Sequence, residues 1–243
     1  GAGHDDPDRP RPDVIHRARG GHGRLAHLAF DLRGQARRRR FLDDFLMSRP
    51  PTAARPLLGL TILLVEDSRY ASEAFRLLCQ RSGARIRRAD SLFSARRHLR
   101  VYRPSVVITD IGLPDGSGLE LLAELARAEP RIDVILGTSG DPDTESAVKA
   151  TGADGFVAKP VARLAEFQSA ILRHLPRDRQ PTGPRIVLEE RIAPDPIALR
   201  DDLAHVADVL SGDEGGPSLD YLTQFLGGVA KSAGDVPLRA AVD

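Results

Sequence analysis

The sequence predicts a doubly wound α/β domain with a five-stranded parallel sheet over residues 59–176, plus flanking helical segments. Short continuous apolar runs, which are typical of strands buried on both faces, alternate with segments whose apolar residues recur at helical spacing. This alternation repeats five times within about 115 residues, and it implies a parallel sheet with helices on both faces. The composition, 41% hydrophobic and 28% charged, is that of a folded globular chain.

The expected elements follow one another in a regular order. Strands are predicted at residues 61–65, 85–88, 106–109, 134–136 and 156–158. Helices are predicted at residues 68–81, from 91 to about 99, around 119–125, from 141, and over 164–175. Ser91 is suited to cap the second helix, and Asp141 followed by Pro142 is a good helix start. The last helix should end at Pro176.

Charge is distributed unevenly along the chain. Residues 1–60 hold twelve Arg and seven Asp, a net charge of +5, whereas residues 187–243 hold four bases and eleven acids, a net charge of −7. We therefore expect four parts: a basic N-terminal extension (1–58), the α/β domain (59–176), a linker (177–186) and an acidic C-terminal extension (187–243).

The C-terminal extension should form two amphipathic helices, over residues 196–210 and 218–232. Two such helices cannot close a core alone, so they must pack on the α/β domain, on residues 24–47 or on a second chain.

The N-terminal extension is expected to be largely disordered or to form a single helix over residues 24–47. The run Arg37–Arg40 could bind nucleic acid or acidic lipid, although such runs usually form a solvated face. The chain begins with Gly and its only methionine is Met47. Two alternatives therefore stand: residues 1–46 are native, or part of them is an artefact preceding a natural start at Met47. Residues 29–36 (AFDLRGQA) faintly resemble a histidine-phosphotransfer helix, with Phe30 in the place of the phosphorylated His.

Composition excludes several classes of protein. The single cysteine, Cys79, rules out an intrachain disulfide and a cysteine zinc cluster. No run of eighteen apolar residues occurs, so the sequence predicts no membrane span. These features together predict a cytoplasmic protein.

Polar side chains follow four of the five predicted strands at their carboxyl ends, namely Glu66, Asp67, Asp110, Thr138, Ser139 and Lys159. Because right-handed crossovers bring these strand ends to one edge of the sheet, the side chains should converge there. Three carboxylates repel one another unless a cation neutralises them, and oxygen ligands favour Mg²⁺, with Mn²⁺ as the alternative. Taken singly, these residues have ordinary structural explanations: the acids could cap helices or stand in turns, the hydroxyls could belong to turns, and the lysine could be solvated. A site is the better interpretation because those explanations would have to hold at every position at once.

Four motifs carry a resemblance to a known family. They are VED at 65–67, VVITDIGLPDGSG at 106–118, ILGTSG at 135–140 and GFVAKP at 155–160. In this order and spacing they resemble the receiver domain of bacterial two-component response regulators, over about residues 60–176. The resemblance implies the flavodoxin-like version of the doubly wound fold.

The resemblance also implies a metal site and a phosphoacceptor. Asp110 would accept the phosphoryl group. Asp67 and Asp110 would hold Mg²⁺ through their carboxylates and Gly112 through its backbone carbonyl, while Glu66 would act mostly through a water on the metal.

The same resemblance implies a switch beside the acceptor. Thr138 and Lys159 would each contact a phosphoryl oxygen, and Phe156 would change its rotamer on phosphorylation. The peptide bond between Lys159 and Pro160 would be cis, which would fix the turn that aims the lysine.

The function that follows is a response regulator of a phosphorelay, a signalling domain with self-catalysed phosphoryl transfer and autodephosphorylation only. A histidine kinase or histidine phosphotransfer protein would donate the phosphoryl group, and the signal would pass through a protein–protein surface, with a homodimer as one alternative.

A transcriptional regulator with an unrecognised DNA-binding output is the second interpretation, although the −7 charge of residues 187–243 is unfavourable for binding DNA. A third is a metal-dependent phosphohydrolase. Such enzymes usually carry an Asp two residues after the nucleophile, where this chain has Gly112.

Overall fold

The computed structural model describes residues 50–183, 189–211 and 218–242. The expectations for residues 1–49, including the helix over 24–47, lie outside the described residues. Within the described ranges, no helix has both the length and the apolar character needed to cross a membrane.

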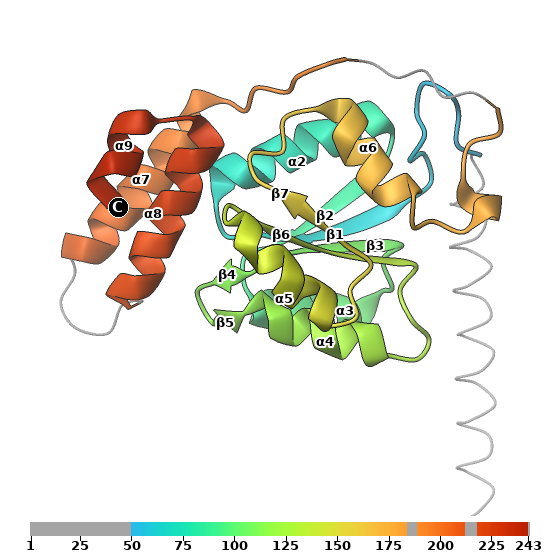
Figure 1. Cartoon of the computed structure of the whole chain (residues 1–243), viewed down its shortest axis with the longest axis horizontal. Helices are drawn as coiled ribbons and strands as arrows, with labels where there is room; N and C mark the ends of the chain where they lie inside the picture. The colour runs from blue at the N-terminus through green and yellow to red at the C-terminus, as the bar shows by residue number, and fades with distance from the viewer. Residues whose placement is uncertain (1–49, 184–188, 212–217, 243) are drawn as a thin grey trace, which may run out of the picture. The chain divides into compact units, whose positions relative to one another are not determined.

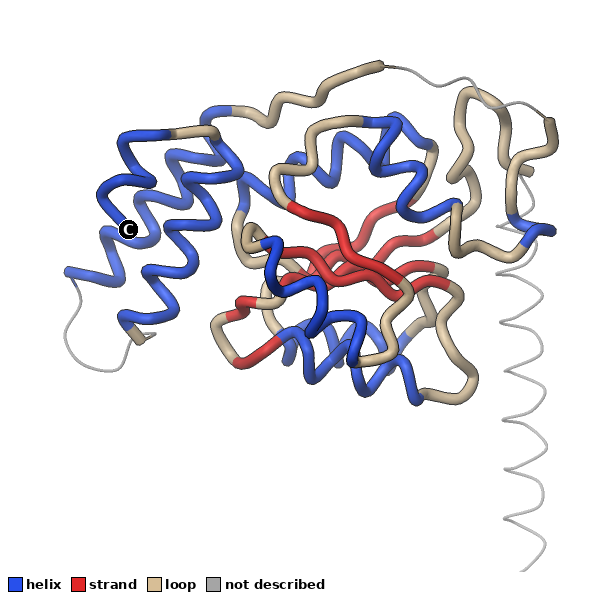
Figure 2. The backbone as a smooth tube through the Cα atoms, in the orientation of Figure 1, coloured by secondary structure: helices blue, strands red, loops and turns tan. Residues whose placement is uncertain are grey.

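Five parallel strands form the central sheet (Figures 1 and 2). They are β1 (Thr61–Val65), β2 (Arg85–Ala89), β3 (Val106–Asp110), β6 (Val134–Ser139) and β7 (Gly155–Ala158). Their order across the sheet is β2-β1-β3-β6-β7, and every neighbouring pair is parallel. This order confirms the predicted doubly wound, flavodoxin-like fold. It also locates the topological switch point between β1 and β3, where a crevice opens at the carboxyl ends of the strands.

Helices cover both faces of the sheet, as Figure 2 shows. One face carries α2 (Arg69–Ser82) and α6 (Leu164–Leu172), and the other carries α3 (Leu92–Val101), α4 (Gly118–Arg127) and α5 (Glu145–Ala150). Successive residues of β1 serve the two cores in turn. Ile62 and Leu64 pack under α2 and α6, whereas Leu63 and Val65 pack on the opposite face. This is why the buried strands read as continuous apolar runs in the sequence.

The helix ends near the carboxyl edge depend on local side-chain caps. Ser68 caps α2 by accepting a hydrogen bond from the Ala71 amide, and Ser91 caps α3 as predicted. Asp141 accepts from the Asp143 amide at the start of a 3₁₀ turn (Pro142–Thr144) that leads into α5. After Asp110 the chain forms a short antiparallel hairpin, β4 (Gly112–Leu113) and β5 (Gly116–Ser117), before α4 begins.

Two segments outside the expected domain limits belong to its core. Leu57, which we placed in the N-terminal extension, is fully buried with the α2 and α6 side of the sheet. Residues 189–192, which we placed in the C-terminal extension, pair with the start of α6: the Ile192 amide donates to the Ala162 carbonyl at 2.7 Å. The hydrophobic effect draws Leu57 and Ile192 inward, although neither stands in a periodic pattern.

The described part of the C-terminal extension forms three helices, not the two we predicted: α7 (Pro196–Ser211), α8 (Leu219–Ala233) and α9 (Val236–Val242). The third has only seven residues, too few for helical periodicity to be recognised. Leu210, near the end of α7, and Leu219, at the start of α8, are 58% and 71% exposed. The small core that α7 and α8 form consists of the buried side chains of Val206, Leu222, Phe225 and Val229. Of the three packing alternatives, the structure shows α7 and α8 packed on the α/β domain, against α2.

Candidate functional site

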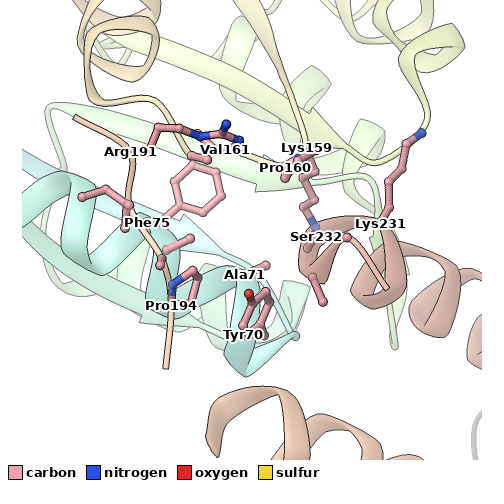
Figure 3. A pocket seen from close by; sticks show the side chains of 16 residues that line it. Tyr70, Ala71, Phe75, Lys159, Pro160, Val161, Arg191, Pro194, Lys231 and Ser232 are labelled. Carbon is pink, nitrogen blue, oxygen red and sulfur yellow. The ribbon is translucent and has the colours of Figure 1, made fainter. Parts of the chain in front are cut away.

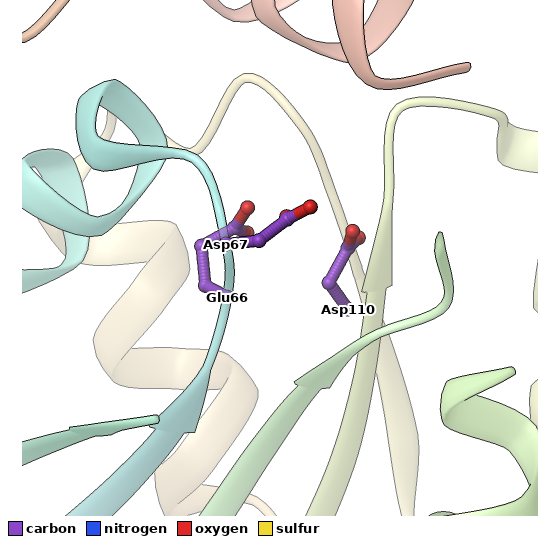
Figure 4. Close-up of side chains that lie close together, drawn as sticks. All are labelled: Glu66, Asp67 and Asp110. Atoms are coloured by element: carbon purple, nitrogen blue, oxygen red, sulfur yellow. The ribbon is translucent and has the colours of Figure 1, made fainter. Parts of the chain in front are cut away.

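Three carboxylates meet at the carboxyl edge of the sheet (Figure 4). Glu66 and Asp67 directly follow β1, and Asp110 is the last residue of β3, so the switch point brings them together. One carboxylate oxygen from each lies within 4.8 Å of the others. Glu66 is 1% exposed and Asp110 is 8% exposed, so the cluster is largely withdrawn from solvent.

Lys159 supplies the one ammonium group in contact with the cluster among the described residues. It follows β7, and its Nζ lies 2.6 Å from Glu66 Oε2 and 3.0 Å from Asp110 Oδ1. Burial alone lowers the pKa of Lys159, but Asp110 and Glu66 outweigh that effect and raise its pKa above the ordinary value. The lysine therefore stays charged and holds the Asp110 carboxylate in place. The peptide bond between Lys159 and Pro160 is cis, as expected.

The buried position of the cluster disfavours the ionised form of Glu66 and Asp67. Burial raises the pKa of Glu66 well above its usual range, against the opposing effect of Lys159. Burial also raises the pKa of Asp67 from 3.8 to about 6, although a hydrogen bond from Tyr221 works in the opposite direction. Three carboxylates with one ammonium group leave an excess of negative charge when all are ionised.

This donor set fits a hard divalent cation. Three carboxylates with converging oxygens and a net negative charge are the ligands that Mg²⁺ prefers. Gly112, expected to add a carbonyl, lines the same small cavity as Glu66, Asp67 and Asp110.

The expected switch residues lie beside the cluster in different environments. Thr138 is fully buried in β6, and its hydroxyl donates to the Val157 carbonyl of β7 at 2.7 Å rather than to any of the three carboxylates. Ser139 accepts from the Asp141 amide and shapes the loop after β6. Phe156 is half-buried against the α3–α4 core.

Residues of the C-terminal helices also reach the site, and our sequence reasoning missed them. Tyr221 of α8 donates its hydroxyl hydrogen to Asp67 Oδ2 at 2.5 Å. The Gln224 carboxamide lies against Gly112. No motif marks these two residues. A sequence signal did exist for Asp202, which is 2% exposed, because it is an acid on the buried side of α7 between Leu199 and Val206.

Comparison with known proteins agrees with this geometry. The family model described as response regulator receiver domain matches residues 62–172. The KDP operon transcriptional regulatory protein KdpE of Escherichia coli is 27% identical over 123 residues, which are 51% of this chain and 54% of that protein. The probable transcriptional regulatory protein TcrX of Mycobacterium tuberculosis is 34% identical over 102 residues, 42% of this chain and 44% of that protein. The chain thus spans about half the length of the curated relatives it matches.

Solved structures are similar to a part of the chain. A putative response regulator from Chloroflexus aurantiacus is 28% identical, covering 42% of this chain and 85% of that one, with a TM-score of 0.40. The receiver domain of a Pseudomonas aeruginosa sensor histidine kinase, solved with magnesium in its active site cleft, is 23% identical. That match covers 47% of this chain and 96% of the other, with a TM-score of 0.43.

Residues 62–172 are a receiver domain of the two-component response regulator family, as the sequence motifs predicted. A receiver domain is a signalling domain, and receivers of this family bind Mg²⁺ at an acidic pocket. The matched region ends at residue 172, so α7, α8 and α9 lie outside it.

Proposed function

We propose that Asp110 accepts a phosphoryl group in a Mg²⁺-dependent reaction, and that the chain then signals through a protein–protein surface. The observation that carries this proposal is the arrangement around Asp110. Its carboxylate lies at the switch point, with Glu66 and Asp67 on one side and the Lys159 ammonium 3.0 Å away. This is the charge arrangement that an anionic acceptor needs to meet an anionic donor.

The donor would be a phosphohistidine on a histidine kinase or phosphotransfer protein, since receiver domains interact with histidine kinases. An Asp110 carboxylate oxygen attacks phosphorus and forms a P–O bond. The P–N bond to imidazole breaks, and the nitrogen keeps the electron pair and takes up a proton. Lys159 orients the acceptor oxygen before transfer and offsets phosphoryl charge afterwards.

Glu66, Asp67 and Asp110 would hold Mg²⁺, together with the Gly112 carbonyl. When bound, the cation neutralises charge on the carboxylates and on the phosphoryl oxygens. Mn²⁺ has the same preference for oxygen ligands and would substitute for it.

Thr138 and Phe156 would report the new phosphoryl group. To donate to a phosphoryl oxygen, the Thr138 hydroxyl must leave its present acceptor, the Val157 carbonyl. That movement would change the packing at the end of β6 and allow the half-buried Phe156 ring to turn. The surface around β7 and α5 would then differ between the two forms.

The protein–protein output is supported by the C-terminal helices, which contact the site directly through Tyr221. A second candidate output is DNA binding, because the curated relatives are named transcriptional regulators. The −7 charge of residues 187–243 is unfavourable for a phosphate-rich partner. A salt-sensitive, phosphorylation-dependent mobility shift with diverse DNA fragments would favour that second candidate.

Labelling with a small radioactive phosphodonor tests the acceptor. We expect Mg²⁺-dependent labelling of the intact chain, lost in Asp110→Asn. The matched control is Asp141→Asn, which alters an exposed carboxylate after β6 that caps the 3₁₀ turn. Labelling that persists in Asp110→Asn, or that disappears equally in Asp141→Asn, would refute the assignment of Asp110.

A further inference from the structure

Helix α8 closes the open side of the carboxylate cluster. The Tyr221 hydroxyl donates to Asp67 Oδ2 at 2.5 Å, across 154 positions of sequence. One turn further along α8, the Gln224 carboxamide occupies the space that a side chain at Gly112 would take, its Nε2 being 2.6 Å from the ideal Cβ position. The absence of a side chain at 112 thus lets α8 approach the site.

Both oxygens of Asp67 are already engaged. Oδ1 accepts from the Ser68 amide at 3.0 Å, a bond within the loop after β1. Oδ2 accepts from Tyr221 of α8. Each oxygen keeps a second lone pair, so a cation that takes Asp67 as a ligand shares the carboxylate with these donors. The Tyr221 hydroxyl draws on the same negative charge, and it is the donor that can leave with its helix.

The space left in the site is small. The cavity between the cluster and α8 has a volume of about 40 Å³, and its α8 side is made by Gln224, Phe225, Gly228, Val229 and Ser232. A water needs roughly 10–15 Å³ of such space, so the cavity holds about three waters. A phosphoryl group adds four heavy atoms, and Mg²⁺ usually keeps several waters of its own. The donor must also reach Asp110 in line, from the side that α8 covers.

The docking of α8 has the features of a contact that can open. It is anchored by polar groups: Asp202 of α7 binds the start of α2, and the Lys231 ammonium donates to the Gly140 carbonyl. The apolar side chains of α7 and α8 pack on one another in a core separate from the two cores of the receiver. Polar interfaces inside a chain release more easily than large apolar ones.

A larger cavity, of about 340 Å³, lies beside the last turn of α8 (Figure 3). It is bordered by α2, by the loop after Lys159, by residues 191–194 and by Lys231 and Ser232. Side chains that face a cavity lose packing contacts on that side. The last turn of α8 therefore lacks packing partners on the side of this cavity.

We propose that α8 is a cover on the phosphoacceptor site: Tyr221 competes with Mg²⁺ for Asp67, and the helix must leave before Asp110 can be phosphorylated. This proposal rests on the function proposed above and assigns α8 a positioning role in it. Docking of the cover and metal binding then oppose each other, and the coupling is reciprocal: each must weaken the other by the same factor.

Mg²⁺ titration by calorimetry on the full chain tests the competition. Tyr221→Phe keeps the ring and removes the hydroxyl, so Mg²⁺ should bind about tenfold more tightly or better, the effect of a hydrogen bond to a charged group. The matched control is Tyr102→Phe, which removes a buried hydroxyl at the end of α3 and should leave the affinity unchanged. Unchanged or weaker binding by Tyr221→Phe would overturn the proposal, and weaker binding would mean that the hydroxyl supports the metal ligand.

Hydrogen exchange on the wild-type chain gives the reciprocal measurement. Saturating Mg²⁺, with or without beryllofluoride, should lower the protection of α8 amides in the wild-type chain. Protection that rises or stays constant would overturn the cover. Labelling of Asp110 is scored separately, so a normal Mg²⁺-dependent label with an unresponsive α8 refutes this inference and leaves the proposed function standing.

Discussion

The contact between Asp202 and the start of α2 offers the sharpest test of how the C-terminal helices are held. Asp202 is 2% exposed, and its carboxylate accepts from Ser68 Oγ at 2.8 Å, from the Arg69 amide at 2.8 Å and from the Tyr70 amide at 3.0 Å. A side chain from α7 thus caps a helix that begins 133 positions earlier. Asp202→Ala removes all three hydrogen bonds and the negative charge at the N-terminus of α2.

The magnitude follows from what happens to the freed donors. An N-cap acceptor contributes about 1 kcal/mol, and a hydrogen bond to a charged group about 1.5–3 kcal/mol. If the helices stay docked, the donors remain buried and unpaired. If the helices undock, water satisfies the donors. The stability lost in Asp202→Ala therefore cannot exceed the free energy of docking. We therefore expect docking to weaken by roughly 2–3 kcal/mol, which corresponds to a 30- to 150-fold change in its equilibrium constant.

Hydrogen exchange of the α8 amides reports the docking equilibrium directly. In Asp202→Ala, protection of α8 should fall by about this factor, while protection of β1 and β3 changes little. The matched control is Asp201→Ala. Its carboxylate pairs with Arg69 on the surface, where the two side chains are 40% and 63% exposed, so the loss should stay below about 1 kcal/mol. If the two variants lower α8 protection equally, the capping argument is wrong.

Three further predictions concern the receiver and its cover. Burial raises the pKa of Cys79 from 9.0 to about 12, so a thiol reagent at pH 8 should react with the native protein only as fast as the chain opens. Gly118→Ala places a Cβ 1.9 Å from the Asp110 carbonyl oxygen, so it should lower the free energy of unfolding, measured with denaturant, by about 1–3 kcal/mol. Its control is Gly228→Ala in α8, where a Cβ meets nothing within 4 Å. That substitution should raise the free energy of unfolding by about 0.5–1 kcal/mol. The folded state holds the Asp67 proton more tightly than the unfolded chain does, with a pKa of about 6 against 3.8. The ionised group therefore opposes folding, and metal-free Asp67→Asn should be more stable than wild type above pH 6, by up to roughly 3 kcal/mol. That advantage should shrink as the pH falls from 6 to 4.

Each of these has an outcome that would contradict it. Reaction of Cys79 at the rate of a free thiol would show that α2 is not packed as described. Equal stability of Gly118→Ala and wild type would mean that the start of α4 can move away from Asp110. A stability difference for Asp67→Asn that grows on acidification would reverse the sign of the argument.

Much of the receiver could be predicted from local patterns. The central strands β1, β3 and β6 contain continuous apolar runs because both of their faces are buried, and polar residues stand at the carboxyl end of each. The caps at Ser91 and Asp141 were readable because a cap depends on only a few neighbouring residues. The convergence of Glu66, Asp67 and Asp110 followed from strand order, which right-handed crossovers restrict to few possibilities.

Other features had no local signal. Leu57 and Ile192 are isolated apolar residues in the sequence that join the core on the α2 and α6 side of the sheet. Helix α9 is too short to show a helical repeat of apolar residues. The hydrogen bond from the Thr138 hydroxyl to the Val157 carbonyl also had no local signal, since a buried hydroxyl takes the nearest available carbonyl.

The sequence by itself determined the α/β domain, its motifs and the set of chemical groups at the sheet edge, because periodicity, caps and crossover handedness act over short stretches of chain. Only the tertiary structure decided what faces that edge. Tyr221 and Gln224 reach the cluster, and Asp202 caps α2, through contacts between helices far apart in the chain. Such contacts depend on how polar surfaces match after the elements have formed, and no spacing along the sequence records that match.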